Sequence, residues 1–209
     1  MNLLIFGASG ITGLELVKQS LALGHVVTAF VRNPAKIAIK NANLKLVQGD
    51  VKDYSLVERI VKGHDAVFST LGVSRKLKRD PIVVDGVRNI IKAMEENNMR
   101  RLVYLSFLGV TESRKDAGFL MNHIVARIVH NEIADHEEKE QSIRSSRLDW
   151  TIVRPPKLTG SSRTGVYRSG EGIKAGSLLP TMSRADVADF MLRQLTDNSF
   201  IRKTPGIMY

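Results

Sequence analysis

Short apolar runs alternate with amphipathic segments along the whole chain. Residues 3–6 are continuously apolar, whereas the apolar positions of residues 10–23 recur at the three- and four-residue intervals of a helix. Gly24 ends that segment, and a run of β-branched residues follows it. The pattern predicts strands at 2–6, 25–31, 43–47, 65–69, 101–106 and 149–153, and helices at 10–23, 53–61, 81–97, 119–146 and 183–195.

Continuous apolar strands that are separated by helices indicate a parallel sheet with both faces covered. Right-handed crossover connections then favour a Rossmann-like, doubly wound α/β fold with strand order 3-2-1-4-5-6 and room for a seventh strand. Residues 158–180 are rich in Gly, Ser and Arg without a helical period, so we expect a loop region on the substrate side over about residues 155–182 and a small C-terminal lobe. No repeat or linker divides the chain, which predicts one domain over residues 1–209.

The motif GASGITG at residues 7–13 lies between the first predicted strand and the first predicted helix. Glycines at this place allow a tight turn, let backbone N–H groups approach a pyrophosphate and let the helix pack closely on the sheet. The amino end of the helix adds partial positive charge. The spacing is GxxGxxG rather than GxGxxG, but its position in an alternating β/α chain predicts a dinucleotide site.

The end of the second predicted strand indicates which dinucleotide is bound. NAD-preferring sites place an acidic residue there, which binds the ribose 2′-hydroxyl. This chain has Arg32 instead, and a guanidinium can grip a 2′-phosphate through two parallel charge-assisted hydrogen bonds. The sequence therefore predicts NADP(H) as the cofactor, with Lys36 as an assisting cation; an exposed arginine that merely follows a strand is the alternative.

Further candidate residues lie where other predicted strands end. Asp50 follows the third strand and could hold an adenine amino group, although an aspartate that caps a turn or helix fits the local sequence nearly as well. Leu71 and Gly72 follow the fourth strand, and Ser106 ends the fifth. Ligands bind outside the carboxyl ends of strands in open α/β sheets, so the shared position favours a common site.

The acid–base pair Tyr-x-x-x-Lys of ordinary short-chain dehydrogenases is absent, because no tyrosine is followed by lysine four residues later. Reduction of an isolated carbonyl creates an alkoxide that needs a positioned acid. A conjugated acceptor, such as a flavin or a linear tetrapyrrole, spreads the incoming charge and can take its proton from water. Orientation against the nicotinamide can then suffice.

His136 is a candidate pocket residue in the predicted helix 119–146. It lies beside Asp135 and Lys139 in the charged run DHEEKE, so it faces either the pocket or a solvated helix surface. We pair it with Ser106 as the candidate catalytic residues, in an orienting or polarising role. No metal site is expected, because acidic residues at ligand spacing are missing around His64, His123 and His130.

The formal net charge of +10 fits either a nucleic-acid partner or a positive cleft that captures an anionic cofactor and substrate. The basic residues are scattered, which favours the second explanation. Their densest group has no interleaved aromatic residues and consists of Arg75, Lys76, Lys78 and Arg79. We therefore expect a small planar, anionic, FMN-like acceptor, no nucleic-acid or membrane partner, and a monomer or weak homodimer.

The chain has no cysteine, which excludes disulfides, thiolate catalysis and cysteine metal sites. Its first residues lack the basic start of a secretory signal, and no apolar run is long enough to span a bilayer. These features predict a cytoplasmic protein.

Seven segments carry a family resemblance: GASGITG, VRN, QGDV, DAVFSTLG, GVRNIIKAM, LDWTIVRPP and ADVADFMLRQL. Across nearly the whole chain they resemble atypical short-chain dehydrogenase/reductases of the NAD(P)H-binding, NmrA-like type, and in particular the flavin reductase family that includes biliverdin-IXβ reductase. A pocket histidine of that family matches His136. The resemblance implies cofactor contacts at Gly7, Ser9, Gly10, Ile11 and Thr12 for the phosphates, Arg32 for the 2′-phosphate, Asp50 and Val51 for the adenine, and Leu71, Gly72, Ser106 and Pro155 beside the nicotinamide.

Two departures from the family leave the acceptor open. Val73 and Ser74 stand where the flavin reductases have Thr-Arg, and Lys157 stands where they have histidine. The leading hypothesis is an NADPH-dependent reductase that passes hydride to a flavin or another planar conjugated acceptor. The alternative is a non-catalytic NADP(H)-binding, NmrA-like redox-sensing regulator. A sugar-nucleotide epimerase or dehydratase is disfavoured, because those enzymes need the missing tyrosine.

Overall fold

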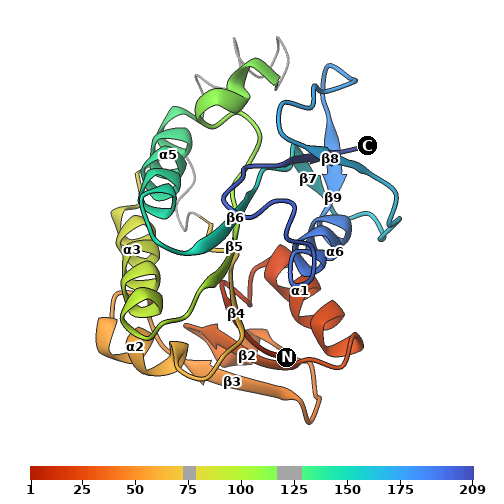
Figure 1. Ribbon diagram of the computed structural model, residues 1–209. Coiled ribbons are helices and arrows are strands. Elements are labelled where there is room, and N and C mark those ends of the chain that lie inside the picture. The colour runs from red at the N-terminus through yellow and green to blue at the C-terminus, as the bar shows by residue number, and fades with distance from the viewer. Residues whose placement is uncertain (73–78, 117–128) are drawn as a thin grey trace.

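The computed structural model describes residues 1–72, 79–116 and 129–209. Its centre is a six-stranded parallel sheet with the order β3-β2-β1-β4-β5-β6, which confirms the predicted order (Figure 1). The strands are β1 (Asn2–Phe6), β2 (Val26–Val31), β3 (Leu44–Gln48), β4 (Ala66–Ser69), β5 (Arg101–Leu105) and β6 (Asp149–Val153). Because β1 pairs with β2 on one side and β4 on the other, the winding direction reverses there and leaves a crevice at the carboxyl ends of the strands.

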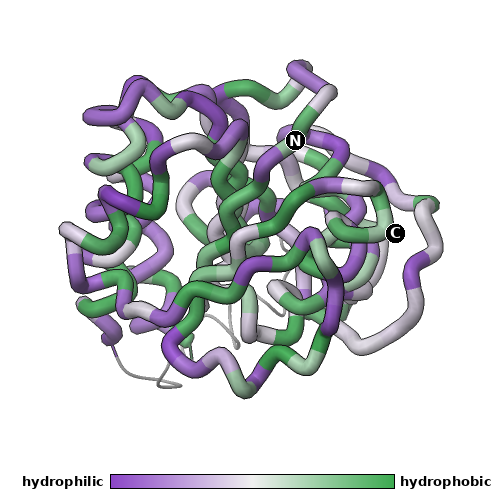
Figure 2. Tube along the Cα trace, turned by 90° about the horizontal axis from the view of Figure 1, so that it is seen from below, coloured by the Kyte–Doolittle hydropathy of each residue, from purple (hydrophilic) through white to green (hydrophobic). Residues whose placement is uncertain are grey.

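Helices cover both faces of the sheet. One face carries α1 (Ile11–Ala22) and α6 (Arg184–Arg193), and the other carries α2 (Tyr54–Val61), α3 (Pro81–Glu96) and α5 (His130–Arg144) (Figure 1). Alternate residues of β1 serve the two layers: Leu3 and Ile5 belong to the core under α1 and α6, and Leu4 and Phe6 to the core under the other helices. Burial on both sides explains why these strands are apolar without alternation. Figure 2 shows hydrophobic stretches through the middle of the molecule and many hydrophilic residues on outer helical turns.

Two helices begin with a side-chain cap. The Asp53 carboxylate accepts from the backbone N–H of Leu56 at the start of α2, and the Ser183 hydroxyl accepts from that of Asp186 at the start of α6. The predicted helix 119–146 is found as α5 from His130 onward, and residues 117–128 lie outside the described part of the chain.

The loop region that we expect over about residues 155–182 contains three short strands and no helix. The segment contains parts of two small sheets, in which β7 (Lys157–Thr159) pairs with β9 (Thr181–Ser183) and β8 (Arg168–Gly170) pairs with β10 (Gly206–Met208). Strands of three residues are too short to show a period. The segment around 202–207 follows β6 through isolated bridges rather than as a full seventh strand, with Thr151 opposite Lys203.

Asp186 of α6 forms hydrogen bonds with the C-terminal lobe. Its fully buried carboxylate accepts hydrogen bonds from the hydroxyls of Ser183, Thr164 and Tyr209 and from the backbone N–H of Gly165. Burial raises the pKa of this carboxyl, but the hydrogen bonds outweigh burial and hold it below its ordinary value. Within the described residues, no helix is long and apolar enough to cross a membrane.

Candidate functional site

A cleft of about 670 Å³ opens at the carboxyl ends of β1, β2, β4 and β5. It brings together nearly all the residues that the sequence marks as candidates: Gly7, Ser9, Gly10, Ile11, Thr12, Arg32, Lys36, Asp50, Val51, Leu71, Gly72, Ser106 and His136. Pro155 is buried and does not line this cleft; its carbonyl accepts from the backbone N–H of Leu108 at 2.7 Å. The volume is within the range of small-molecule and cofactor sites.

The glycine turn brings backbone close to backbone at two places. Gly7 has a φ of +77°, and a Cβ there would lie 2.7 Å from the backbone of Thr70. A Cβ on Gly13 would collide with the Gly7 carbonyl oxygen. Gly10 is the N-cap residue of α1 and makes no side-chain capping hydrogen bond. The first N–H groups of the helix therefore stay available to an anion.

Four cations and one carboxylate line the cleft. The cations are Arg32, Lys36, Lys52 and Arg184, and none of them forms a salt bridge with a carboxylate of the described residues. The carboxylate is Asp50, which accepts from the Lys52 backbone N–H at 3.0 Å and therefore closes a turn while it faces the cleft. The arrangement gives the cleft a positive field that suits phosphate groups.

Sequence reasoning missed Arg184 and Lys52, because it considered only the strand ends and the glycine turn. Arg184 is the first residue of α6 and lies directly after the capping Ser183. The signal was available, since a basic residue in the first turn of a helix is unfavourable for the helix dipole.

Ser106 and His136 meet at the other end of the cleft. The Ser106 Oγ lies 3.3 Å from the His136 Nδ1, and the hydroxyl of the fully buried Tyr104 lies 3.2 Å from the same nitrogen. The ring of Phe107, which also lines the cleft, meets the His136 ring edge-on at 4.9 Å between centroids. His136 is only 8% exposed and lines the cleft, so of the two alternatives it takes the pocket position rather than one on a solvated helix surface.

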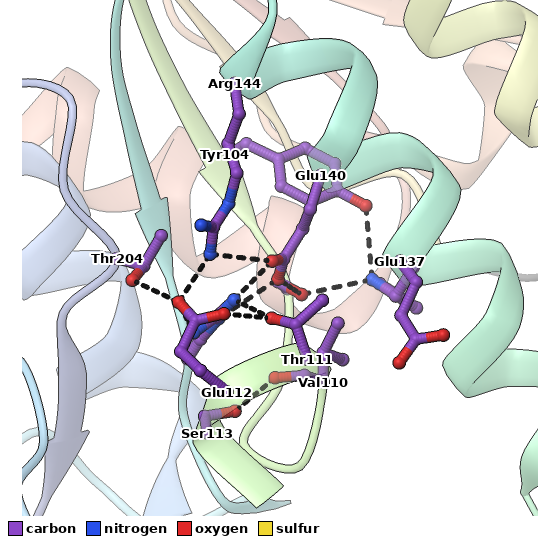
Figure 3. Close-up of polar contacts among 12 residues, drawn as sticks. Tyr104, Val110, Thr111, Glu112, Ser113, Glu137, Glu140, Arg144 and Thr204 are labelled. Carbon is purple, nitrogen blue, oxygen red and sulfur yellow. Dashed lines mark hydrogen bonds and ion pairs between the residues drawn. The ribbon is translucent and has the colours of Figure 1, made fainter.

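A buried network of hydrogen bonds and ion pairs contacts Ser106 (Figure 3). Ser106 donates to Glu140 Oε1 at 2.6 Å, and Glu140 in turn accepts from Arg154 Nε at 3.1 Å and from the second terminal nitrogen of that guanidinium. Arg154 continues to Glu112 at 2.9 Å and to the hydroxyl of Thr111 at 2.6 Å. Glu140 and Arg154 have side chains that are 0% and 2% exposed, so this pair lies fully inside the protein.

Burial and neighbouring charges shift the pKa values of Arg154, His136 and Tyr104. Burial lowers the pKa of Arg154, but the hydrogen bonds and charges of Glu140 and Glu112 outweigh it and raise the pKa above its ordinary value. Burial, helped by the charge of Lys139, holds the pKa of His136 well below its ordinary value. Burial likewise raises the pKa of Tyr104. At neutral pH the cleft therefore faces a neutral imidazole with a charged pair behind it.

Most of the charged run DHEEKE on α5 is buried, which differs from the solvated helix surface that the sequence left open as an alternative. Asp135, Lys139 and Glu140 are fully buried. Arg79, the described member of the basic group at 75–79, forms ion pairs with Asp135 and, at 2.6 Å, with Glu138. The other three members lie outside the described residues. Arg79 is thus held by carboxylates rather than presented to a ligand.

A second, smaller cavity of about 330 Å³ lies at the other end of the network, beyond Arg154. Glu112 and Asp116 from the 3-10 turn Thr111–Asp116 line it, together with Glu171 and Thr204 from the C-terminal lobe. The buried network therefore separates two cavities.

The chain matches the sequence profile of the NAD(P)H-binding family over residues 7–198. A (4-alkanoyl-5-oxo-2,5-dihydrofuran-3-yl)methyl phosphate reductase of Streptomyces griseus is 29% identical over 153 residues, which are 73% of this chain and 46% of that protein. This chain thus spans less than half the length of that relative. ChuY, an anaerobillin reductase from Escherichia coli O157:H7, superposes with a TM-score of 0.83 at 19% identity, over 100% of this chain and 97% of that one. A short-chain dehydrogenase/reductase of Veillonella parvula in complex with NADP gives 0.79 at 20% identity, over 100% and 94%.

The family match covers most of the chain, so this protein belongs to the NAD(P)H-binding family. The match confirms the family resemblance and a nicotinamide dinucleotide as the class of cofactor. The solved structures add that the whole chain, including the C-terminal lobe, has the same fold as these two proteins.

Proposed function

We propose that this protein is an NADPH-dependent reductase that passes hydride to a flavin or another planar conjugated acceptor. The observation that carries the proposal is one continuous cleft with two chemically different ends. The glycine turn and Arg32 form the first end, and Ser106, Phe107 and His136 form the second. A dinucleotide bound along the strand tips spans these ends, which is the arrangement that hydride transfer requires.

The preference for NADPH rests on the cations of the cleft. Arg32 follows β2, where a carboxylate would bind the 2′-hydroxyl of NAD, and Lys36 lies on the next turn. Both line the cleft. A relative of the same fold was solved in complex with NADP, which agrees with this assignment.

The planar acceptor is supported by the second end of the cleft. Phe107 offers an aromatic ring, and Ile82 and Leu158 add apolar surface. When bound, reduced nicotinamide supplies a hydride, which carries two electrons. The chain's own residues orient the acceptor, exclude water and offer His136 and Ser106 as hydrogen-bonding groups. Two relatives named above are reductases by name, which favours turnover over a purely regulatory role.

Steady-state oxidation of NADPH with FMN, riboflavin and a simple quinone tests the proposal. We expect turnover with the flavins, and FMN should be the better flavin at low salt because its phosphate meets the positive cleft; the gap should narrow as ionic strength rises. The matched control is Gly10→Val, which places a branched side chain in the pyrophosphate space and should abolish both NADPH binding and turnover. Tight NADPH binding without turnover of any acceptor would instead identify a cofactor-sensing regulator.

A further inference from the structure

Two hydroxyl groups converge on one nitrogen of His136. The Nδ1 atom lies 3.2 Å from the Tyr104 hydroxyl and 3.3 Å from the Ser106 hydroxyl. Tyr104 comes from β5, Ser106 follows that strand, and His136 lies on α5, so the contact joins the sheet to the helix beside the cleft. Figure 3 shows Tyr104 and Glu140 next to each other in this place.

Counting protons assigns the donor in each contact. Glu140 is a carboxylate held by Arg154, so the Ser106 proton goes to Glu140, at 2.6 Å. Tyr104 is fully buried, and burial raises its pKa, so its phenol keeps its proton. Among the described residues, the one hydrogen-bond partner of that phenol is the His136 Nδ1. The phenol must therefore donate, and Nδ1 must accept.

His136 lines the cleft, and the ring nitrogen that remains for a ligand is Nε2. Burial and the charge of Lys139 keep the pKa of His136 well below its ordinary value, so the ring is neutral and has one proton. With Nδ1 as an acceptor, that proton lies on Nε2. Nε2 has no hydrogen-bond partner within the described part of the chain, and His136 lines the cleft. The wall thus presents an N–H donor beside the Ser106 oxygen.

We propose that Tyr104 is a positioning residue that fixes His136 as the neutral Nε2–H tautomer. The cleft therefore selects acceptors that place a hydrogen-bond-accepting atom, such as a carbonyl oxygen or an imine-type ring nitrogen, beside that N–H. The assignment of the acceptor rests on the proposed reductase function. The assignment of the tautomer rests on the contacts and on the burial of the two side chains, and not on the proposed function. Tyr104 acts through His136 and does not touch the cleft.

Nitrogen-15 NMR of the full chain with labelled histidine measures the tautomer directly. The chain has five histidines, and loss of one signal set in His136→Gln assigns the residue. We expect wild type to show a protonated Nε2 and a bare Nδ1. Tyr104→Phe should shift the ring toward the Nδ1–H form, which can donate to Ser106, whereas Tyr54→Phe, at a tyrosine bound to Glu96 between α2 and α3, should change nothing. A protonated Nδ1 in wild type, or an unchanged tautomer in Tyr104→Phe, would overturn the role of Tyr104.

Kinetics test the acceptor class separately. Tyr104→Phe should raise the flavin KM by about three- to tenfold, the loss of one neutral hydrogen bond, and leave the NADPH Kd unchanged. An unchanged flavin KM together with a changed tautomer would overturn the acceptor assignment and leave the tautomer assignment in place. If wild type turns over no acceptor, the proposed reductase function fails, and the NMR result still decides the role of Tyr104.

Discussion

The buried pair of Arg154 and Glu140 offers the most demanding test of how this site is held together. Arg154→Met and Glu140→Leu each remove one charge from a pair whose side chains are 2% and 0% exposed. The double variant replaces both charges with apolar side chains. Together with wild type, the three variants form a double-mutant cycle that measures the interaction and not only the cost of truncation.

The two single variants should lose different amounts of the free energy of unfolding. Loss of Arg154 leaves Glu140 fully buried with the Ser106 hydroxyl and with Arg144 at 3.7 Å, so we expect a cost near the top of the range for a broken buried pair, about 4–5 kcal/mol. Loss of Glu140 leaves Arg154 with Glu112 at 2.9 Å, so about 3 kcal/mol is expected. The double variant should lose less than either single variant, because no unpaired charge remains buried.

Urea unfolding at pH 7, followed by the fluorescence of Trp150, provides the assay. This is the chain's single tryptophan, and it lies 6% exposed in β6, the strand that Arg154 directly follows. Unchanged m-values must accompany the shifts for the free energies to be compared. Additive losses in the double variant, or a loss below about 1 kcal/mol in either single variant, would refute the assignment of a buried, coupled pair.

Three further outcomes follow from the same structure. Arg32→Ala should weaken NADPH binding by about 1.5–3 kcal/mol, the size of a charged hydrogen bond, and spare NADH; equal losses in a titration with both cofactors would contradict the 2′-phosphate role. Gly13→Ala should destabilise the fold by about 1–3 kcal/mol, because its Cβ meets the Gly7 carbonyl, whereas Gly160→Ala has open space and should keep its Tm. Burial lowers the pKa of Lys139 to about 8, against 10.5 ordinarily, so the unfolded chain holds this proton more tightly and the free energy of unfolding should rise by about 3 kcal/mol between pH 8 and 10.5. Lys139→Met should remove that rise, and an identical pH profile of Tm in both proteins would show that the ammonium is not desolvated.

The strand order and the helix starts could be predicted because their causes are local. A continuous apolar strand signals burial on both faces, and Asp53 and Ser183 cap helices with groups that lie within three residues. The positions of the cleft residues followed from one topological fact, that parallel strands end at the same edge. Predictions of this kind do not require a partner that is distant in sequence.

The rest of the site depends on distant partners, which a local pattern does not reveal. Glu140 and Asp135 read as surface charges on a helix because their partners, Arg154 and Arg79, are far away in the chain. The short strands β7 and β8 pair with segments that follow them by many residues. Arg154 is the exception, since it directly follows β6 and the rule for strand ends could have marked it.

The supply of protons explains why the absent Tyr-x-x-x-Lys pair fits the proposed acceptor. The chain does place a tyrosine and a lysine near the site, but Tyr104 is fully buried with its proton directed to His136, and Lys139 is buried without a hydrogen bond to its ammonium within the described residues. The Ser106 proton is directed to Glu140.

The group that faces the acceptor is then a neutral imidazole N–H, which orients a carbonyl well but is a poor acid. This N–H stabilises the alkoxide of an isolated carbonyl only weakly, because an alkoxide needs a strong proton donor. It is sufficient for a conjugated ring, which spreads the charge of the hydride and takes its proton from water. The same protein should therefore reduce flavins and leave simple aliphatic ketones untouched, and NADPH-dependent reduction of such a ketone at a rate comparable to that of FMN would contradict this account of the site.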